Sequence, residues 1–117
     1  MQKFTNYTEN SIDVNHVNLD SELIFLSENG KQVGSLILCY NGDLANVFSL
    51  AVLEKYRGKG YGKKLMDGAI KRSKARGCKT MELNTEVDNT VANKLYESMG
   101  FQLNGIKDEY NNYQLPI

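Results

Sequence analysis

The sequence has little of the residue types on which many catalytic and metal sites depend. It holds no tryptophan, two cysteines, Cys39 and Cys78, and a single histidine, His16. A histidine-based metal site or a Ser-His-Asp triad would have to be built on His16, which stands in the polar run DVNHVN and is expected to be an exposed or edge-strand residue. The two thiols predict free cysteines in a reducing compartment, as small buried residues rather than acyl-carrying nucleophiles.

An excess of one charge and long apolar runs are also missing. Lysine and arginine together number 14, as do aspartate and glutamate, so the formal net charge is zero, whereas a general nucleic-acid binder usually shows a basic excess. No apolar run approaches the roughly 18 residues of a membrane span, and the first residues lack the apolar segment of a secretion signal. We therefore expect one soluble, cytoplasmic domain over residues 1–117 that binds no membrane.

Hydrophobic patterning predicts a run of strands in the first half of the chain. Residues 1–20 are polar, rich in asparagine and without a clear period. Residues 22–27, 32–40 and 45–53 are typical of strands. The Asn-Gly pair in the turn ENGK favours a hairpin between the first two strands, and the turn residues NGD end the second strand. The three strands are therefore expected to form an antiparallel meander.

The period changes to a helical one in the second half. Apolar or small residues recur at helical spacing from Gly62 until Gly77, which is expected to end the helix. Residues 80–87 alternate as a strand, residues 90–99 form a second helix, and a final hairpin turns near residues 108–109. Because the first helix is a crossover, the strands on either side of it should be parallel and close, which predicts an α+β fold with a mixed, mostly antiparallel sheet and helices packed on it. The basic residues expected on the polar face or at the C-terminal end of the first helix are Lys63, Lys64, Lys71, Arg72, Lys74 and Arg76.

Three alternate glycines stand directly before the first predicted helix, in the stretch YRGKGYGKKL at residues 56–65. Glycine is costly in a helix, but the first N–H groups of a helix have no intrahelical partner and lie at the positive end of its dipole. They hold phosphate oxygens when no side chain blocks the approach. Neither the Walker nor the Rossmann glycine spacing fits. We interpret the stretch as a phosphate-binding loop to which Lys59, Lys63 or Lys64 adds charge.

Two motifs together resemble the GCN5-related N-acetyltransferase (GNAT) family. The spacing Arg57-x-x-Gly60-x-Gly62, after a strand ending in LAV, is similar to the family's acetyl-coenzyme A (acetyl-CoA) signature, and NTVANKLYESMGF at residues 89–101 is similar to its N-x-x-A-x-x-L-Y-x-x-x-G-F. The ending YQLPI resembles the last strand of ribosomal-protein N-terminal acetylases. The resemblance covers residues 22–117 and implies the acyl-CoA N-acyltransferase fold, with a splayed central parallel pair and with N-terminal helices that are reduced or absent.

The resemblance also implies which residues bind acetyl-CoA. Backbone amides of residues 58–63 hold the pyrophosphate, and the amide of Val52 bonds the thioester carbonyl. Arg57 stands at the first motif position, either as a contact or as a solvated loop residue, and Asn89 caps its helix, contacts the cofactor, or does both. The full set is Leu50, Ala51, Val52, Arg57, Gly58, Lys59, Gly60, Tyr61, Gly62, Lys63, Asn89 and Tyr96.

For catalysis, the resemblance implies that Tyr96 protonates the leaving thiolate, and packing against the sheet is the alternative role of its ring. The family's general base is a glutamate at a position occupied here by Asn46 or by Asn84, depending on the branch, and neither amide can act as a base. Glu82 and Glu86 share a strand face with Asn84 under strict alternation. Glu86 is the candidate general base, and a plain surface glutamate is the alternative.

The sequence thus predicts an enzyme that moves acetyl from acetyl-CoA to a primary amine by direct attack in a ternary complex, with no metal. The acceptor is a protein, a peptide or a small molecule. The sequence leaves open whether the protein forms a homodimer. A coenzyme A-binding regulatory module without turnover is the main alternative, because the expected glutamates are missing. A nucleic-acid binder built on the basic clusters at residues 57–64 and 71–76 is the weakest alternative.

Overall fold

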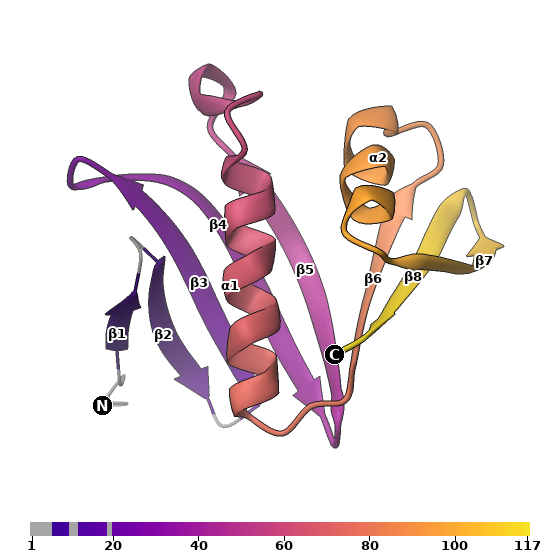
Figure 1. Ribbon diagram of the computed structural model, residues 1–117, viewed down its shortest axis with the longest axis horizontal. Coiled ribbons are helices and arrows are strands. Elements are labelled where there is room, and N and C mark those ends of the chain that lie inside the picture. The colour runs from indigo at the N-terminus through magenta and orange to yellow at the C-terminus, as the bar shows by residue number, and fades with distance from the viewer. Residues whose placement is uncertain (1–5, 10–11, 19) are drawn as a thin grey trace.

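The computed structural model describes residues 6–9, 12–18 and 20–117, and residues 6–9 and 13–18 are described by their backbone alone (Figure 1). Neither α-helix of these residues is long and apolar enough to cross a membrane. The elements are β1 (Asn6–Glu9), β2 (Ile12–Asn18), β3 (Ser21–Glu28), β4 (Lys31–Asn41), β5 (Leu44–Val52), the 3₁₀ turn η1 (Glu54–Tyr56), α1 (Tyr61–Ala75), β6 (Thr80–Glu86), α2 (Thr90–Ser98), β7 (Gln102–Lys107) and β8 (Tyr110–Pro116).

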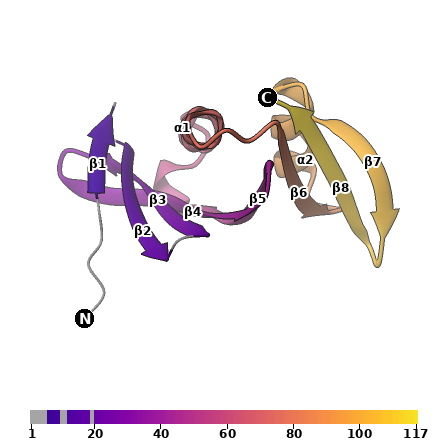
Figure 2. The same cartoon turned by 90° about the horizontal axis from the view of Figure 1, so that it is seen from below.

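The eight strands of the described residues form one sheet in the order β1-β2-β3-β4-β5-β6-β8-β7. Neighbouring strands are antiparallel except β5 and β6, which run parallel on the two sides of the crossover helix α1. Figure 2 shows α1 on the concave side of the curved sheet. The predicted mixed, mostly antiparallel sheet with one central parallel pair is therefore confirmed.

The predicted turns at residues 29–30 and 108–109 are present and share one backbone pattern. Asn29 and Gly30 join β3 to β4 with φ angles of 51° and 78°, and Asp108 and Glu109 join β7 to β8 with 53° and 67°. Two successive residues with positive φ make a tight turn whose twist matches that of the paired strands. Gly77, predicted to end the first helix, has a left-handed φ of 87° just after it.

Strands β1 and β2 lie in the segment for which the sequence showed no period, so the sequence analysis missed them. β2 pairs with β3 from Ile12 opposite Leu26 to Asn18 opposite Ser21. Strand formation here depends on the partner strand, which the composition of an asparagine-rich segment does not reveal. His16 lies in β2, between β1 and β3, so it is not in an edge strand, and its side chain lies outside the described residues. No helix precedes β3 in the described residues.

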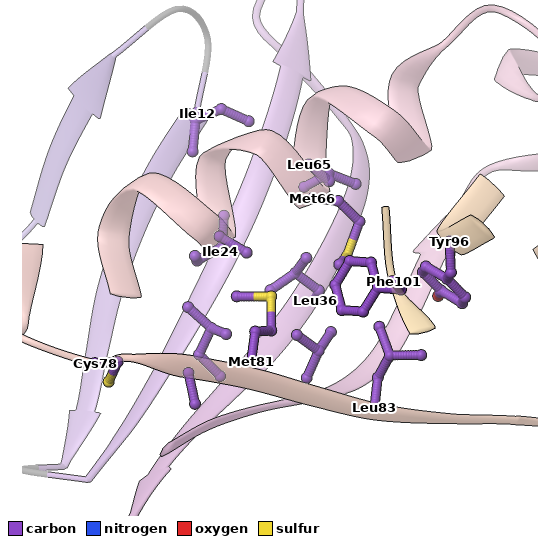
Figure 3. Close-up of a cluster of buried hydrophobic side chains, with 14 of the residues drawn as sticks. Ile12, Ile24, Leu36, Leu65, Met66, Cys78, Met81, Leu83, Tyr96 and Phe101 are labelled. Carbon is purple, nitrogen blue, oxygen red and sulfur yellow. The ribbon is translucent and has the colours of Figure 1, made fainter. Parts of the chain in front are cut away.

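The hydrophobic core lies between one face of the sheet and the two helices (Figure 3). Along β3 and β6 the buried residues alternate with more accessible ones, as strand geometry requires. Gly34 in β4 lets α1 approach the sheet, because a Cβ at that position would lie 2.8 Å from Leu65 Cδ1. The buried residues of α1 all belong to the predicted helical stripe and are Leu65, Met66, Ala69 and Ser73.

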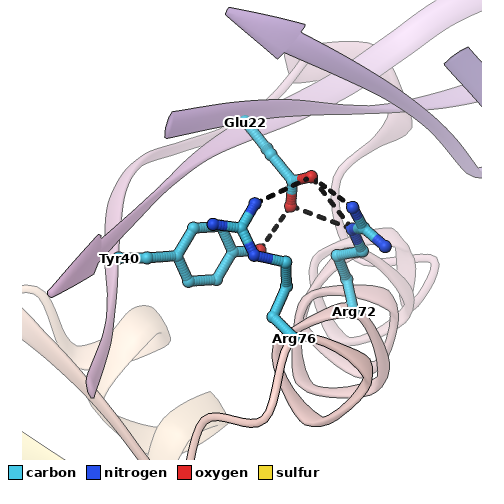
Figure 4. A network of polar contacts seen from close by, with 4 residues as sticks. All are labelled: Glu22, Tyr40, Arg72 and Arg76. Carbon is cyan, nitrogen blue, oxygen red and sulfur yellow. Dashed lines mark hydrogen bonds and ion pairs between the residues drawn. The ribbon is translucent and has the colours of Figure 1, made fainter. Parts of the chain in front are cut away.

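A buried carboxylate binds the C-terminal half of α1 to the sheet (Figure 4). Glu22 in β3 is 0% exposed, and Arg72 donates to both of its oxygens, with Nη2 2.6 Å from Oε2. The Tyr40 hydroxyl donates to the same carboxylate, and Arg76 lies 3.6 Å from it and over the Tyr40 ring. Burial, and then the bond to Glu22, raise the pKa of the Tyr40 phenol well above its ordinary value.

Arg72 and Arg76 lie at the C-terminal end of the helix, as predicted, but the sequence analysis did not foresee their buried partner Glu22. Arg72 and its partner Glu22 are 50 residues apart in the chain, so local periodicity could not bring them together. By fixing α1 against β3 and β4, the network also fixes the direction of the N-terminus of α1, where the glycine loop lies.

Candidate functional site

Strands β5 and β6 part half way along their length, and the site lies where they part (Figure 1). Their parallel pairing begins at Leu44 and ends at Val47, which stands opposite Leu83. The register of β5 against β4 shifts beside Ser49, which takes a left-handed φ of 56°. A bulge of this kind adds a residue to one strand and bends it, so β5 turns away from β6. The splayed central pair implied by the resemblance is confirmed.

A cavity of about 250 Å³ lies between the separated strands. Residues from both faces of the sheet line it, because the strands no longer pair there. Tyr96 reaches the cavity from the buried face beneath α2. Asn84 and Glu86 reach it from the opposite face, which no helix of the described residues covers. A molecule bound in the cavity is therefore accessible from one face and contacts a buried phenol on the other.

The backbone N–H of Val52 points into the open side of β5. Leu53 donates its N–H to the Val33 carbonyl at 2.8 Å, and Val52 stands opposite Gly34. Hydrogen-bonded and non-hydrogen-bonded pairs alternate along an antiparallel ladder, so Val52 turns its N–H and C=O away from β4, toward the side from which β6 has parted. Arg57 Nε donates to that carbonyl at 2.9 Å, so Arg57 anchors the glycine loop to β5, a contact that the sequence analysis did not foresee.

The glycine loop presents free backbone amides at the start of α1. Gly58 and Gly60 adopt left-handed φ angles of 76° and 82°, and Gly60 is the N-cap residue. In the part of the chain that the structure describes, no group accepts from the N–H groups of residues 58–63, and the first helical bond runs from the Lys64 N–H to the Gly60 carbonyl at 3.1 Å. A Cβ built on either glycine would meet nothing within 4 Å, so the amides are open to a ligand.

Three lysines gather around the Tyr56 ring, beside this loop. The ammonium groups of Lys31, Lys55 and Lys59 lie 5.9, 5.3 and 5.6 Å from the centre of the Tyr56 ring, at the end of η1, a turn that the sequence analysis did not predict. These charges add to the positive end of the α1 dipole. The three lysines and the helix dipole together favour an anion at this loop.

Two other residues of the predicted loop are engaged through their side chains. Lys63 Nζ lies 3.1 Å from Asp67 Oδ2 on the exposed side of α1. The Tyr61 ring packs 6.0 Å from the Tyr56 ring, and a hydrogen bond to Glu28 is the main cause that raises the pKa of its phenol. Any contact of Tyr61 and Lys63 with a phosphate would then come from their backbone amides.

Tyr96 is the buried member of the site. It is 6% exposed, and its ring packs against Phe101 and Tyr113 at centroid distances of 5.8 and 6.0 Å. Burial raises the pKa of its phenol above the ordinary value, and a hydrogen bond with Thr85 opposes part of the rise. The hydroxyl is therefore protonated at neutral pH, which is the state that a proton donor needs. Because Tyr96 belongs both to the core and to the cavity, packing and proton donation do not exclude each other.

Asn89 and Asn93 join the end of β6 to α2. Asn89 caps α2 as predicted, since its Oδ1 accepts from the Ala92 N–H at 3.2 Å, and it also lines the cavity. Asn93, which the sequence analysis did not select, donates to the carbonyls of Asn89 at 2.8 Å and Glu86 at 3.1 Å, and accepts from the Tyr113 hydroxyl at 3.0 Å. A polar residue on the face of a helix that packs on a sheet is the signal that could have identified it.

The two candidate bases lie on the face opposite the core. Glu82, Asn84 and Glu86 alternate with buried residues of β6, which confirms that the three share a face. Glu86 is exposed and lines the same cavity as Tyr96. Glu82 stands beside Asn46 in the parallel pairing and lines a neighbouring cavity of about 210 Å³. Glu86 is thus the carboxylate that shares its cavity with the candidate acid.

Neither cysteine belongs to the site. Cys39 and Cys78 are both free, with Cys78 buried and Cys39 half-buried. Burial raises the pKa of the Cys78 thiol, which disfavours the nucleophilic thiolate form. Within the described residues, no group of three or more histidine, cysteine, aspartate or glutamate side chains is placed to hold a metal ion.

The fold is that of the acyl-CoA N-acyltransferases. PaiA N-acetyltransferase from Thermoplasma acidophilum, solved in complex with coenzyme A, matches with a TM-score of 0.82 at 22% identity, over 86% of this chain and 63% of its own. The ribosomal-protein-S18-alanine N-acetyltransferase from Escherichia coli matches with a TM-score of 0.78 at 27% identity, over 86% of this chain and 71% of its own. The model of the acetyltransferase (GNAT) family matches residues 2–101, and the chain belongs to that family.

A curated relative supports the same family. The [ribosomal protein bS18]-alanine N-acetyltransferase of Haemophilus ducreyi is 42% identical over 74 residues, which is 63% of this chain and 50% of the relative. The chain therefore spans half the length of this relative. The family resemblance drawn from the glycine loop and from residues 89–101 is confirmed.

Proposed function

We propose that the chain is an N-acetyltransferase that takes acetyl from acetyl-CoA and transfers it to a primary amine. One observation carries the proposal: the cavity between β5 and β6 brings a buried, protonated tyrosine and a carboxylate to one place, beside a strand edge with an outward N–H and a loop of open amides. Membership in the family and the coenzyme A in the related PaiA structure support acetyl-CoA as the donor.

Acetyl-CoA would lie along the separated edge of β5. Its pyrophosphate accepts from the amides of residues 58–63, where the helix dipole and the nearby lysines favour negative charge. Its pantetheine arm extends beside Leu50, Ala51 and Val52 like an added strand. The Val52 N–H then donates to the thioester carbonyl, on which negative charge grows as the amine attacks.

The amine would attack from the face that carries Asn84 and Glu86. A bond forms between its nitrogen and the acetyl carbon, the carbon–sulfur bond breaks, and Tyr96 donates its phenol proton to the departing sulfur. Glu86 takes the proton that the ammonium must lose before it attacks, directly or through water. The nitrogen loses a second proton to solvent as the tetrahedral intermediate collapses to the neutral amide. After the acetylated amine and coenzyme A have left, Glu86 releases its proton and Tyr96 takes one up from solvent, so the cycle closes without a covalent acyl-enzyme and with one proton released.

We infer that the acceptor is the N-terminal amine of a protein or peptide. Two of the relatives described above are named for the alanine of a ribosomal protein. In the described residues no helix covers the face of entry, and a groove of about 630 Å³ runs from Asn84 along the β7–β8 hairpin. A groove of that size admits an extended chain.

Gly60→Val is expected to abolish measurable acetyl-CoA binding in calorimetry. A Cβ at Gly60 meets no protein atom, but its methyl groups would occupy the space that a phosphate oxygen needs. The matched control is Gly42→Val at the β4–β5 turn, which has φ of 62°, the same empty surroundings and therefore a similar backbone strain. The control should bind with the wild-type Kd. A folded Gly60→Val protein that also binds with the wild-type Kd would contradict the assignment of the loop.

Glu86→Gln is expected to lower kcat/KM for the acceptor about 10- to 100-fold near neutral pH, because the attacking amine loses its proton acceptor. The loss should shrink as the pH rises and the amine deprotonates by itself, which a pH–rate profile would show. Glu109→Gln removes a charge beside Glu86 but outside the cavity that holds Tyr96, so it should keep the wild-type profile. An unchanged Glu86→Gln profile together with a depressed Glu82→Gln profile would transfer the role to Glu82.

The alternative of a coenzyme A-binding module without turnover has one specific support, the amides at positions 46 and 84. The two functions differ in one observable. An enzyme releases coenzyme A only when an acceptor amine is present, whereas a binding module retains acetyl-CoA intact whatever amine is added.

A further inference from the structure

Asn112 in β8 has side-chain hydrogen bonds whose direction is set by a carboxylate. Its Nδ2 lies 2.7 Å from Glu82 Oε1, and because an ionised carboxylate only accepts, this end of Asn112 is the NH₂ group. The same group donates to Asn84 Oδ1 at 2.9 Å, and Asn112 Oδ1 accepts from Asn104 at 3.1 Å. Gln114 donates to the second oxygen of Glu82 at 3.3 Å. The five side chains form one ordered network across β6, β8 and β7.

This network determines which end of Asn84 faces the cavity. Its Oδ1 is bound by Asn112, so its NH₂ group turns away from β8. Among the residues that the structure describes, no acceptor binds that NH₂ group. Asn84 lines the cavity that holds Tyr96, the neighbouring cavity beside Glu82, and the groove along the β7–β8 hairpin. A hydrogen-bond donor is thus held where the groove meets the cavity.

We propose that Asn84 is a specificity-determining residue of the acceptor site, whose NH₂ group binds the carbonyl oxygen next to the reacting amine. The proposal rests on the proposed function, because it takes the amine to enter along this groove. The α-amine of a peptide carries a carbonyl on the adjacent carbon, whereas an alkylamine or a lysine side chain does not. A carboxamide takes no proton at neutral pH, so this position selects the acceptor and does not activate it. Asn112 is the positioning residue that keeps the NH₂ group pointed at the acceptor.

The experiment is an NMR titration of the protein saturated with coenzyme A. The ligands are the tripeptide Ala-Gly-Gly and its alkene isostere, in which CH=CH replaces the first peptide bond and removes the carbonyl oxygen. We expect the tripeptide to shift the Asn84 side-chain NH₂ signals and the isostere to leave them in place. Asn84→Asp replaces the donor by an acceptor of the same shape, and should raise the Kd of the tripeptide about tenfold. It should not raise the Kd of the isostere, which has no carbonyl oxygen for the new carboxylate to repel.

Two further variants separate positioning from folding. Asn112→Ala should also lower the affinity of the protein for the tripeptide and its preference for the tripeptide over the isostere, because Asn84 can then rotate. Its affinity for coenzyme A should not change. Asn41→Asp makes the same chemical change at an exposed residue at the far end of β4 and should have no effect.

The failures of the two proposals are distinguishable. Wild-type affinity of Asn84→Asp for the tripeptide, equal shifts with the isostere, or no tripeptide binding at all would each overturn the role of Asn84. The expected binding pattern without formation of acetylated tripeptide from acetyl-CoA would support the role of Asn84 and overturn the transferase function.

Discussion

Replacing Tyr96 by phenylalanine is expected to lower kcat by about 10²-fold or more, while the Kd for acetyl-CoA changes little. The ring of Tyr96 still fills its place against Phe101 and Tyr113, so the cavity keeps its shape. Only the hydroxyl that donates to the departing thiolate is lost. The measurement is a steady-state assay of coenzyme A release with saturating acceptor, together with calorimetry for the donor.

A matched control for this change is Tyr113→Phe. Tyr113 is also a buried tyrosine with a hydrogen-bonded hydroxyl, but its partners are Asn93 and Glu97 and it does not line the cavity. Loss of the Tyr113 hydroxyl should lower the free energy of unfolding by about 1 kcal/mol and leave kcat near the wild-type value. A Tyr96→Phe enzyme with unchanged kcat, under conditions in which the chemical step limits the rate, would show that Tyr96 is only a packing residue.

The pH dependence follows from the raised pKa of Tyr96. An acid acts in its protonated form, and burial holds this phenol protonated beyond the ordinary pKa of 10.0. The wild-type rate should therefore not fall on the basic side until the pH exceeds about 10.

Replacing Glu22 by glutamine is expected to lower the free energy of unfolding by about 3–5 kcal/mol. The change leaves two arginine side chains, which are 17% and 27% exposed, and a tyrosine hydroxyl around a fully buried neutral amide. Breaking one side of such an ionic network costs more than the network itself contributes, because the remaining charges stay partly desolvated without their partner. Urea denaturation followed by circular dichroism would measure the loss.

A small domain has only about 5–15 kcal/mol of stability in total, so Glu22→Gln could leave too little folded protein to measure. Tyr40→Phe is then the informative variant, since it removes one hydrogen bond to the carboxylate and should cost about 1–3 kcal/mol. Glu28 is half-buried at the other end of the same strand. The free energy of unfolding of Glu28→Gln should lie within about 0.5 kcal/mol of the wild-type value. Equal stability of Glu22→Gln and Glu28→Gln would contradict the role of the network.

The parts of the fold that were predicted correctly depend on short-range features. The Asn-Gly turn, the apolar stripe of α1, the cap at Asn89 and the glycine at position 77 each involve residues within a few positions of one another. The crossover connection then requires β5 and β6 to be parallel. The glycine loop could be located for the same reason, because a strand, three glycines and a helix follow one another in the chain.

The parts that could not be predicted depend on partners that are distant in the chain. Strands β1 and β2 exist because β3 is there to pair with, and Arg72 turns toward the sheet because Glu22, 50 residues away in the chain, faces it there. The orientation of Asn84 depends on Asn112 in the last strand. Pattern and propensity contain none of these pairings, which is why the side-chain network around Asn84 could not be predicted from the sequence.

The most direct test of the central claim is the transfer of radiolabelled acetyl from acetyl-CoA to a panel of amines that includes N-terminal alanyl peptides. The proposed function predicts labelled acetyl-amide, released together with an equal amount of coenzyme A, and loss of both products in Tyr96→Phe. Binding of acetyl-CoA without acceptor-dependent release of coenzyme A for any amine in the panel would contradict it.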